Sequence, residues 1–141
     1  MKIILDTNIL ISAIIKDSFI RKLLFENSTI IHIPDYVLDE IKEHEIEIAK
    51  KSKLGIDEMR FLIKKLIKNT EIVRRENILP FREKAREIIQ NIDIDDVLII
   101  ASALYVNNSI IWSEDKDLKR QIIIKVCNTK EIVNLLSRND S

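Results

Sequence analysis

The chain has 141 residues, with 23 Lys and Arg against 23 Asp and Glu, and its 46% hydrophobic content is typical of a folded domain. Its one cysteine excludes an internal disulfide, and one cysteine with two histidines excludes a Cys/His zinc site of the usual ligand number. Its one glycine, Gly55, excludes the glycine-rich loops that bind nucleotide phosphates.

The apolar runs and the first residues of the chain indicate where in the cell the protein is expected. No apolar run approaches the roughly 20 residues that cross a membrane. The chain begins MKIILDTN, and an acid at the sixth residue comes too early for a secretory signal peptide. We therefore expect a cytoplasmic protein with no membrane contact and one domain over residues 1–141.

Short apolar runs alternate with amphipathic segments along the chain. The apolar runs predict strands at 2–5, 29–33, 71–73, 109–112 and 122–126. Helices are predicted at 9–14, 18–27, 35–51, 57–68, 80–91 and 93–107, with a helical turn at 117–120 and a last helix capped by Asn128 and Glu131. Strands this uniformly apolar suit a parallel sheet covered on both faces, so we predict an α/β fold of three layers.

The balanced net charge hides an uneven distribution. Residues 50–86 hold 12 Lys and Arg and 5 Asp and Glu, a net of +7, and the rest of the chain carries −7. One interpretation is solvated helix faces, because Lys and Glu favour helices. The other is a basic flank that steers a polyanion toward an acidic centre.

Four acids map to one edge of the predicted sheet. Asp6 ends the first strand and Asp115 follows the fourth, whereas Glu40 and Asp96 lie early in helices that leave the second strand and return to the fourth. Ligands of open parallel sheets bind beyond the carboxyl ends of the strands, and a helix that leads back to a strand begins at that same edge. We therefore expect the four carboxylates to converge.

Each acid also has a structural explanation. Asp6 would cap the helix after it, Asp115 would cap the next turn, and Asp93 is the expected cap of helix 93–107. Asp95 is expected to be solvated, and Asp117 fits either explanation.

Glu40 is the most informative acid. Its helix predicts one buried stripe, formed by Val37, Ile41, His44 and Ile48. Glu40 borders this stripe, where an unpaired carboxylate is costly, whereas Asp39 is expected to face water. Three other residues are expected to pack rather than to catalyse: His32, His44 and Trp112.

Acids that only cap or face solvent have no reason to share one edge, where they would repel one another. A divalent cation removes the conflict, because oxygen ligands suit Mg²⁺ or Mn²⁺. Such an ion lowers the pKa of a bound water and neutralises a phosphodiester under in-line attack. Cys127 has no candidate base nearby in the sequence, so it does not offer a competing chemistry.

Four segments resemble the motifs of the PIN domain family, in the family's order and over nearly the whole chain. They are DTNIL at 6–10, YVLDEI at 36–41, DDVLIIASAL at 95–104 and WSEDKDL at 112–118. The residues that match the family's four acids are Asp6, Glu40, Asp96 and Asp115. Val97 stands where the family usually has Ala, and Ser113 where it has Thr or Ser.

This resemblance implies a five-stranded parallel sheet in the order 3-2-1-4-5 and a ribonuclease that depends on Mg²⁺ or Mn²⁺, often as a homodimer. Many small members are VapC-type toxins, neutralised by an antitoxin whose tail covers the acidic site. The four acids would hold the metal, and three residues would align the ligands and water: Asn8, Ser113 and Asp117. Six lysines would flank RNA: Lys50, Lys51, Lys53, Lys64, Lys65 and Lys68.

Two alternatives stay open. A receiver-type signalling domain also binds Mg²⁺, but it needs paired acids after the first strand and a phosphoacceptor Asp ending the third, where this chain has Arg74 and Arg75. A catalytically inactive PIN-like scaffold would act as a binding module.

Overall fold

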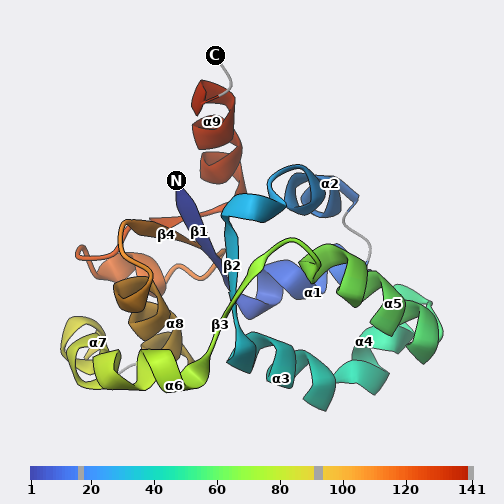
Figure 1. The fold of residues 1–141 in the computed structure, drawn as a ribbon, viewed down its shortest axis with the longest axis horizontal. Helices are drawn as coiled ribbons and strands as arrows, with labels where there is room; N and C mark the ends of the chain where they lie inside the picture. Colours follow the sequence, from blue (N-terminus) through green and yellow to red (C-terminus); the bar gives the residue numbers. More distant parts are fainter. Residues whose placement is uncertain (16–17, 91–93, 140–141) are drawn as a thin grey trace.

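The computed structural model describes residues 1–15, 18–90 and 94–139. Within them, strands form one parallel sheet in the order β3-β2-β1-β4-β5, which confirms the predicted topology (Figure 1). The strands are β1 (Lys2–Leu5), β2 (Ile31–Pro34), β3 (Glu71–Val73), β4 (Ser109–Trp112) and β5 (Val126–Cys127).

Helices cover both faces of this sheet. Figure 1 shows α6, α7 and α8 on one side and α1, α3, α4 and α5 on the other. The α-helices are α1 (Thr7–Ile15), α2 (Ser18–Glu26), α3 (Asp35–Glu43), α4 (Glu45–Ser52), α5 (Ile56–Ile67), α6 (Arg75–Ile78), α7 (Arg82–Ile89), α8 (Ile94–Tyr105) and α9 (Thr129–Asn139). Short 3₁₀ turns are η1 (Ser28–Ile30), η2 (Leu79–Phe81) and η3 (Leu118–Arg120).

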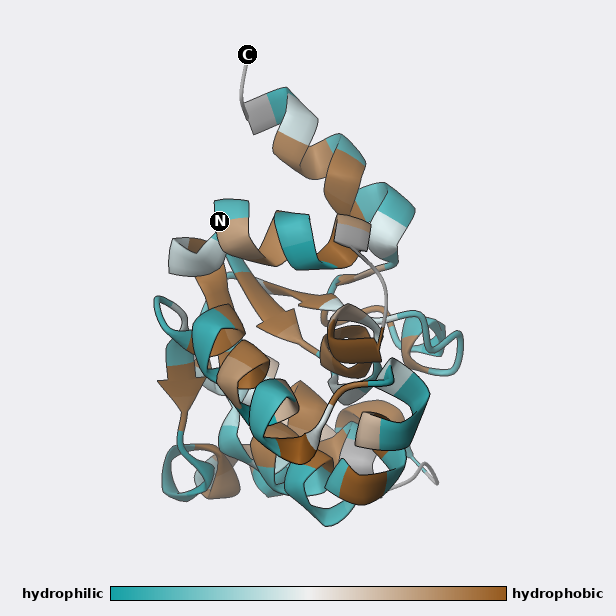
Figure 2. Cartoon of the chain, turned by 90° about the vertical axis from the view of Figure 1, so that its right-hand side faces the viewer, coloured by the Kyte–Doolittle hydropathy of each residue, from teal (hydrophilic) through white to brown (hydrophobic). Residues whose placement is uncertain are grey.

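The strands are buried from both sides. Ile3, Ile4 and Leu5 are fully buried, although successive side chains of a strand point to opposite faces. In Figure 2 the strands are coloured almost wholly apolar, whereas the helices alternate apolar and polar residues. The three-layer prediction is confirmed. In the part of the chain that the structure describes, every helix is too short or too polar to cross a lipid bilayer.

The predicted helix over 35–51 is two helices that meet at His44. The backbone of His44 leaves the helical region, with φ −108° and ψ 18°, and its N–H donates to the carbonyls of Glu40 and Ile41 at 3.2 Å each. His44 is therefore exposed, and the expectation that it packs in the buried stripe is wrong. The aliphatic members of that stripe are buried as predicted: Val37, Ile41 and Ile48.

The helix predicted from Pro80 starts earlier and is interrupted. α6 begins at Arg75, whose N–H donates to Asp35 Oδ2 at 3.0 Å. Pro80 then lies in the η2 turn that precedes α7, an early helical position where its missing N–H needs no partner. The earlier start depends on a contact across 40 residues, which local patterns do not reveal.

Two strand boundaries also differ from the prediction. β2 begins at Ile31 because residues 28–30 form η1, and β5 is limited to Val126–Cys127 rather than 122–126. Before β5, Gln121 Nε2 donates to the Ile124 carbonyl at 2.7 Å and its Oε1 accepts the Ile124 N–H at 2.8 Å. These side-chain bonds occupy backbone groups that a longer strand would pair. Ile122 is consequently 92% exposed.

Candidate active site at the carboxyl edge of the sheet

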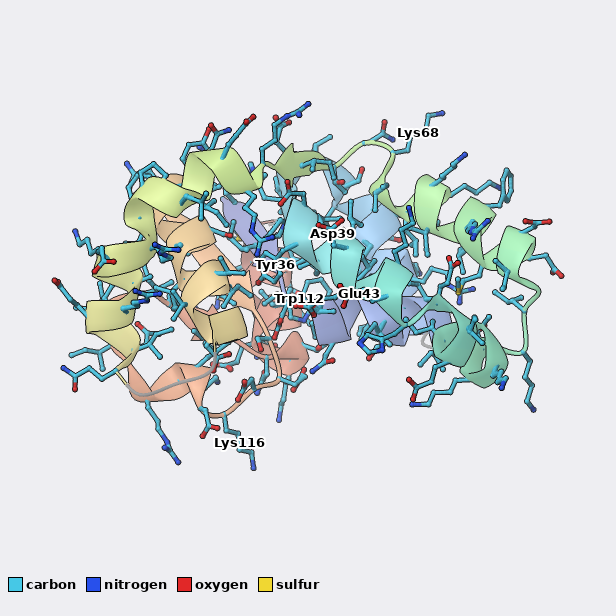
Figure 3. The ribbon with its side chains drawn as sticks, turned by 90° about the horizontal axis from the view of Figure 1, so that it is seen from below. Tyr36, Asp39, Glu43, Lys68, Trp112 and Lys116 are labelled. Carbon is cyan, nitrogen blue, oxygen red and sulfur yellow. The ribbon has the colours of Figure 1, made fainter. Side chains whose placement is uncertain are left out.

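All four predicted acids belong to segments that begin or end at the carboxyl edge of the sheet. Figure 3 views the molecule from the side on which β2 leads into α3. Asp6 directly follows β1, and Asp115 lies in the segment after β4. Glu40 lies in α3, which leaves β2, and Asp96 lies in the first turn of α8, which leads back to β4.

A chain of hydrogen bonds joins the segments that follow β1 and β4. Ser113 Oγ donates to Asp6 Oδ2 at 2.6 Å and accepts the N–H of Asp115 at 3.0 Å. Asp115 Oδ1 in turn accepts the N–H of Asp117 at 2.8 Å. Because Ser113 is only 1% exposed, this hydroxyl is a buried link that fixes Asp6 relative to Asp115.

Asp6 does not act as an ordinary helix cap. Its carbonyl accepts the N–H of Ile9 at 3.1 Å, so it stands where α1 begins. Its side chain, however, accepts the N–H of Thr7 and the hydroxyl of Ser113 rather than the N–H of the second or third helical residue. The carboxylate is therefore oriented by the segment after β4 as much as by its own helix.

Asp115 and Asp117 have different surroundings. Asp115 is half-buried, and its bond to the Asp117 N–H confirms that it stabilises the turn after it. Asp117 is exposed, and its carboxylate pairs with Arg120 at 3.3 Å. Asp117 thus contributes to this edge through its backbone N–H, which orients the Asp115 carboxylate.

Glu40 and Asp96 belong to helices that lie on opposite sides of the sheet, α3 and α8. Both are half-buried, whereas Asp39 is exposed, as predicted (Figure 3). Asn8 is exposed in the first turn of α1, and its carbonyl accepts the Ser12 hydroxyl at 2.9 Å. Asp93 lies outside the described residues, as does the side chain of Asp95.

The donor chemistry of this edge fits a hard divalent cation, because the candidate ligands are carboxylate oxygens. Within residues 1–15, 18–90 and 94–139, however, no three Asp, Glu, His or Cys side chains already stand together as a group that could hold a metal ion. The assignment of the metal to the four acids thus remains a prediction.

Asp35 is a further acid at this edge that sequence reasoning missed. Its Oδ2 accepts the N–H of Arg75, and its Oδ1 is buried without a hydrogen-bond partner among the described residues. A buried carboxylate oxygen normally has a partner, so this atom adds acceptor capacity near the edge. The signal was present, because Asp35 follows the second strand as Asp6 follows the first.

The other candidate side chains have structural roles. Trp112 is buried and its Nε1 donates to Thr129 Oγ1 at 3.0 Å, which confirms that it packs in the core. Burial raises the pKa of the Cys127 thiol, which disfavours the thiolate that a nucleophile needs. His32 is half-buried within β2.

The six lysines predicted to flank RNA are all exposed. Lys51 pairs with Glu47 at 3.6 Å, and Lys65 Nζ lies 4.6 Å from the centroid of the Phe61 ring. Lys68, labelled in Figure 3, comes between α5 and the start of β3 and therefore lies toward the amino edge of the sheet. The lysines thus form two exposed groups, one at the end of α4 and one at the end of α5.

The sequence as a whole matches one family. The family model of the PIN domain matches residues 4–134, and the chain belongs to that family. This membership confirms the resemblance drawn from the four motifs. A comparison with curated proteins gives no match.

Two solved structures show the same fold. One is VapBC2 from Rickettsia felis bound to a DNA fragment from its promoter, with 23% identity, a TM-score of 0.68, and coverage of 91% of this chain and 98% of that chain. The other is DNA-bound VapBC from Salmonella typhimurium, with 18% identity, a TM-score of 0.69 and the same coverage. At these identities the likeness concerns the fold.

Proposed function

We propose that the chain is a Mg²⁺- or Mn²⁺-dependent endoribonuclease that hydrolyses RNA phosphodiester bonds. The observation that carries this proposal is the hydrogen-bond chain from Asp6 through buried Ser113 to Asp115. It is supported by the order of the elements, because α3, which contains Glu40, and α8, which contains Asp96, begin at the same edge. Membership of the PIN domain family disfavours the receiver-type alternative. The inactive PIN-like scaffold is the alternative that an experiment must test.

In the proposed mechanism, Asp6, Glu40, Asp96 and Asp115 would hold the metal. The chemistry that it would supply when bound is a lower pKa for a water and compensation of charge on the phosphodiester. Ser113 keeps Asp6 Oδ2 oriented through its 2.6 Å bond, and the Asp117 N–H does the same for Asp115 Oδ1. Asn8, in the first turn of α1, aligns ligands and water. Such orientation limits the rearrangement that reaction requires.

The proposed substrate contacts are electrostatic. Lys50, Lys51 and Lys53 belong to the end of α4, and Lys64, Lys65 and Lys68 to the end of α5. Exposed ammonium groups attract phosphates without reading bases, so these lysines would strengthen binding of any RNA sequence.

We further propose that the nuclease is the toxin of a toxin–antitoxin pair, that it acts in the cytoplasm as a homodimer, and that an antitoxin binds it. The support is the shared fold with two VapBC proteins that cover nearly the whole chain. Two measurements test this: growth arrest on expression, relieved by the product of a neighbouring small reading frame, and sedimentation of the purified protein.

The nuclease proposal is tested by cleavage of pooled RNA with and without Mn²⁺. Glu40→Gln is compared with Asp39→Asn, the exposed acid beside it on α3. We expect Mn²⁺-dependent cleavage in the parent and in Asp39→Asn, and loss by about 100-fold in Glu40→Gln, the scale for disturbing a metal site. Absence of metal-dependent cleavage by the parent would favour the inactive scaffold.

A further inference from the structure

A polar cleft lies on the sheet face that α6 and α8 cover. It encloses about 540 Å³ and is lined by residues from the start of β1, from β2 and β3, from α6 and from the end of α8. Small-molecule sites fall within this size range. The lining combines side chains of both charges with amides and one tyrosine.

His32 lies within this cleft. It pairs in register with Glu71 of β3 and with Ile4 of β1, so its imidazole shares a sheet face with the Glu71 carboxylate and the Lys2 side chain. Its Nδ1 is buried and has no hydrogen-bond partner among the residues described. Because Nδ1 is enclosed by protein atoms, the ring forms part of the cleft wall and serves to report a bound ligand rather than to bond it through this nitrogen.

The charged groups of the cleft are also unpaired. Lys2, Glu71 and Arg74 line it, and none of them forms an ion pair with another described residue. The Arg74 guanidinium suits a phosphate group, which Arg binds through two parallel hydrogen bonds.

The remaining lining suits a nucleobase. Tyr105 is 42% exposed, and its ring is supported edge-to-face by Phe81, with centroids 6.1 Å apart. Bases stack on such exposed aromatic rings. Asn77 and Glu71 offer the amide and carboxylate groups that pair with base edges.

From this lining we propose that the cleft between β2–β3 and the end of α8 binds a nucleotide. Arg74 contacts its phosphate, Tyr105 stacks on its base, and Glu71 and Asn77 bond polar groups of the base. The nucleotide is either free or one unit of a single-stranded RNA, and the experiment below distinguishes these two sources.

The Tyr105 end of this cleft is separate from the proposed nuclease site, whereas Arg74 at its other end precedes Arg75, whose N–H contacts Asp35 at the carboxyl edge. Tyr105 and Asp96 lie at opposite ends of α8, nine residues apart, which corresponds to about 13 Å along the helix axis. The nucleotide proposal does not depend on catalysis, because binding is measured without divalent metal. A finding that the protein is not a nuclease would therefore not contradict nucleotide binding in the cleft.

The test is NMR titration of the protein with adenosine and uridine monophosphates in EDTA, followed at the ring nitrogens of His32. We expect saturable changes at His32 and affinity about tenfold weaker in Arg74→Ala and in Tyr105→Ala, the scale for losing a charged hydrogen bond or a stacked ring. Arg75→Ala is the matched control, because Arg75 is the next arginine along the chain and does not line the cleft. Melting curves establish that each variant is folded.

Two further arms complete the experiment. A short single-stranded oligoribonucleotide that binds more tightly than either monophosphate, with the same variant effects, identifies RNA as the source; weaker oligonucleotide binding identifies the free nucleotide. No change at His32 at millimolar nucleotide overturns the proposal. An equal change with inorganic phosphate, or binding insensitive to Arg74→Ala and Tyr105→Ala, also overturns it.

Discussion

The carboxyl edge of the sheet and the cleft beneath α8 differ in whether their polar side chains bond one another. At the edge, Asp6, Ser113 and Asp115 are joined into one hydrogen-bond chain around a buried hydroxyl. In the cleft, His32 Nδ1 is buried without a partner among the described residues. At the edge the hydrogen-bond chain orients Asp6 and Asp115, whereas two charged side chains that line the cleft, Glu71 and Arg74, form no ion pair with another described residue.

We expect the largest effect on RNA cleavage from replacing Asp6 at the carboxyl edge. Asp6→Asn removes one charge at nearly constant shape, so metal-dependent cleavage should fall by about 100-fold or more. Without metal, this variant should melt no lower than the parent, because the amide oxygen can still accept the Ser113 hydroxyl and the negative charge at this edge falls by one. Added Mn²⁺ should raise the melting temperature of the parent alone.

The measurements are RNA cleavage and thermal melting of both proteins, each with and without Mn²⁺. A variant that melts lower without metal but cleaves at the parental rate would identify Asp6 as a structural residue only.

Ser113→Ala should have the next largest effect. It leaves Asp6 Oδ2 and the Asp115 N–H without their shared partner, at a cost of about 1–3 kcal/mol in unfolding free energy. Loss of an orienting bond should also reduce cleavage by about 10–100-fold. Ser113→Thr keeps the hydroxyl and should retain most activity.

Denaturant unfolding and cleavage rates check both effects. Ser137→Ala is the control, because the Ser137 hydroxyl is exposed and bonds only its own helix, at the carbonyl of Val133. Equal stability and activity in Ser113→Ala and Ser137→Ala would contradict the role of the buried link.

The next prediction concerns the pH dependence of stability, to which His32 in the cleft contributes. Burial lowers the pKa of His32 from its usual 6.5, and the nearby Glu71 carboxylate partly opposes this. As the pH falls below 6.5 the unfolded chain takes up the proton first, so stability present above 6.5 is lost as the pH falls through the folded-state value. His32→Gln should therefore flatten the pH dependence of unfolding as the pH falls below 6.5.

Chemical denaturation at several pH values measures this slope. His44→Gln removes the other imidazole, at an exposed position, and should keep the parental slope. If His32→Gln and the parent lose stability equally with falling pH, His32 does not contribute to that loss.

We expect the smallest effect on RNA binding from replacing the exposed lysines at the ends of α4 and α5. Replacing Lys50, Lys51, Lys64 and Lys65 with Gln should weaken RNA binding for every sequence. The slope of log affinity against log salt should fall by about one for each phosphate that the lysines no longer neutralise. Lys22 and Lys130, exposed elsewhere, provide the matched replacements. An unchanged salt slope would mean that the lysines are only a solvated face.

Local patterns were sufficient for the sheet and for the segments that carry the acids. Uninterrupted apolar runs predicted β1, β3 and β4 at their observed bounds, and strand order followed from the family resemblance. The capping box before α9 is also present, with Asn128 Oδ1 accepting the Glu131 N–H at 2.9 Å. These features depend on residues within a few positions of one another.

The missed features depend on contacts between distant residues or on a single residue's backbone. Asp35 holds the start of α6 from 40 residues away, and Ser113 reaches Asp6 across 107 residues. The break at His44 occurs without a proline or glycine to signal it. The cleft escaped detection because its polar groups come from β1, β2, β3, α6 and α8, none of which carries a recognisable motif for such a site.

The short β5 has a consequence for the protein in concentrated solution. A five-residue edge strand rich in isoleucine would present a row of unpaired backbone groups on which another chain could add a strand. The Gln121 side chain instead bonds the backbone N–H and C=O of Ile124, and the strand is only two residues long. The chain can therefore keep Ile122 and Ile123 at its surface while offering little backbone for fibre growth along this edge.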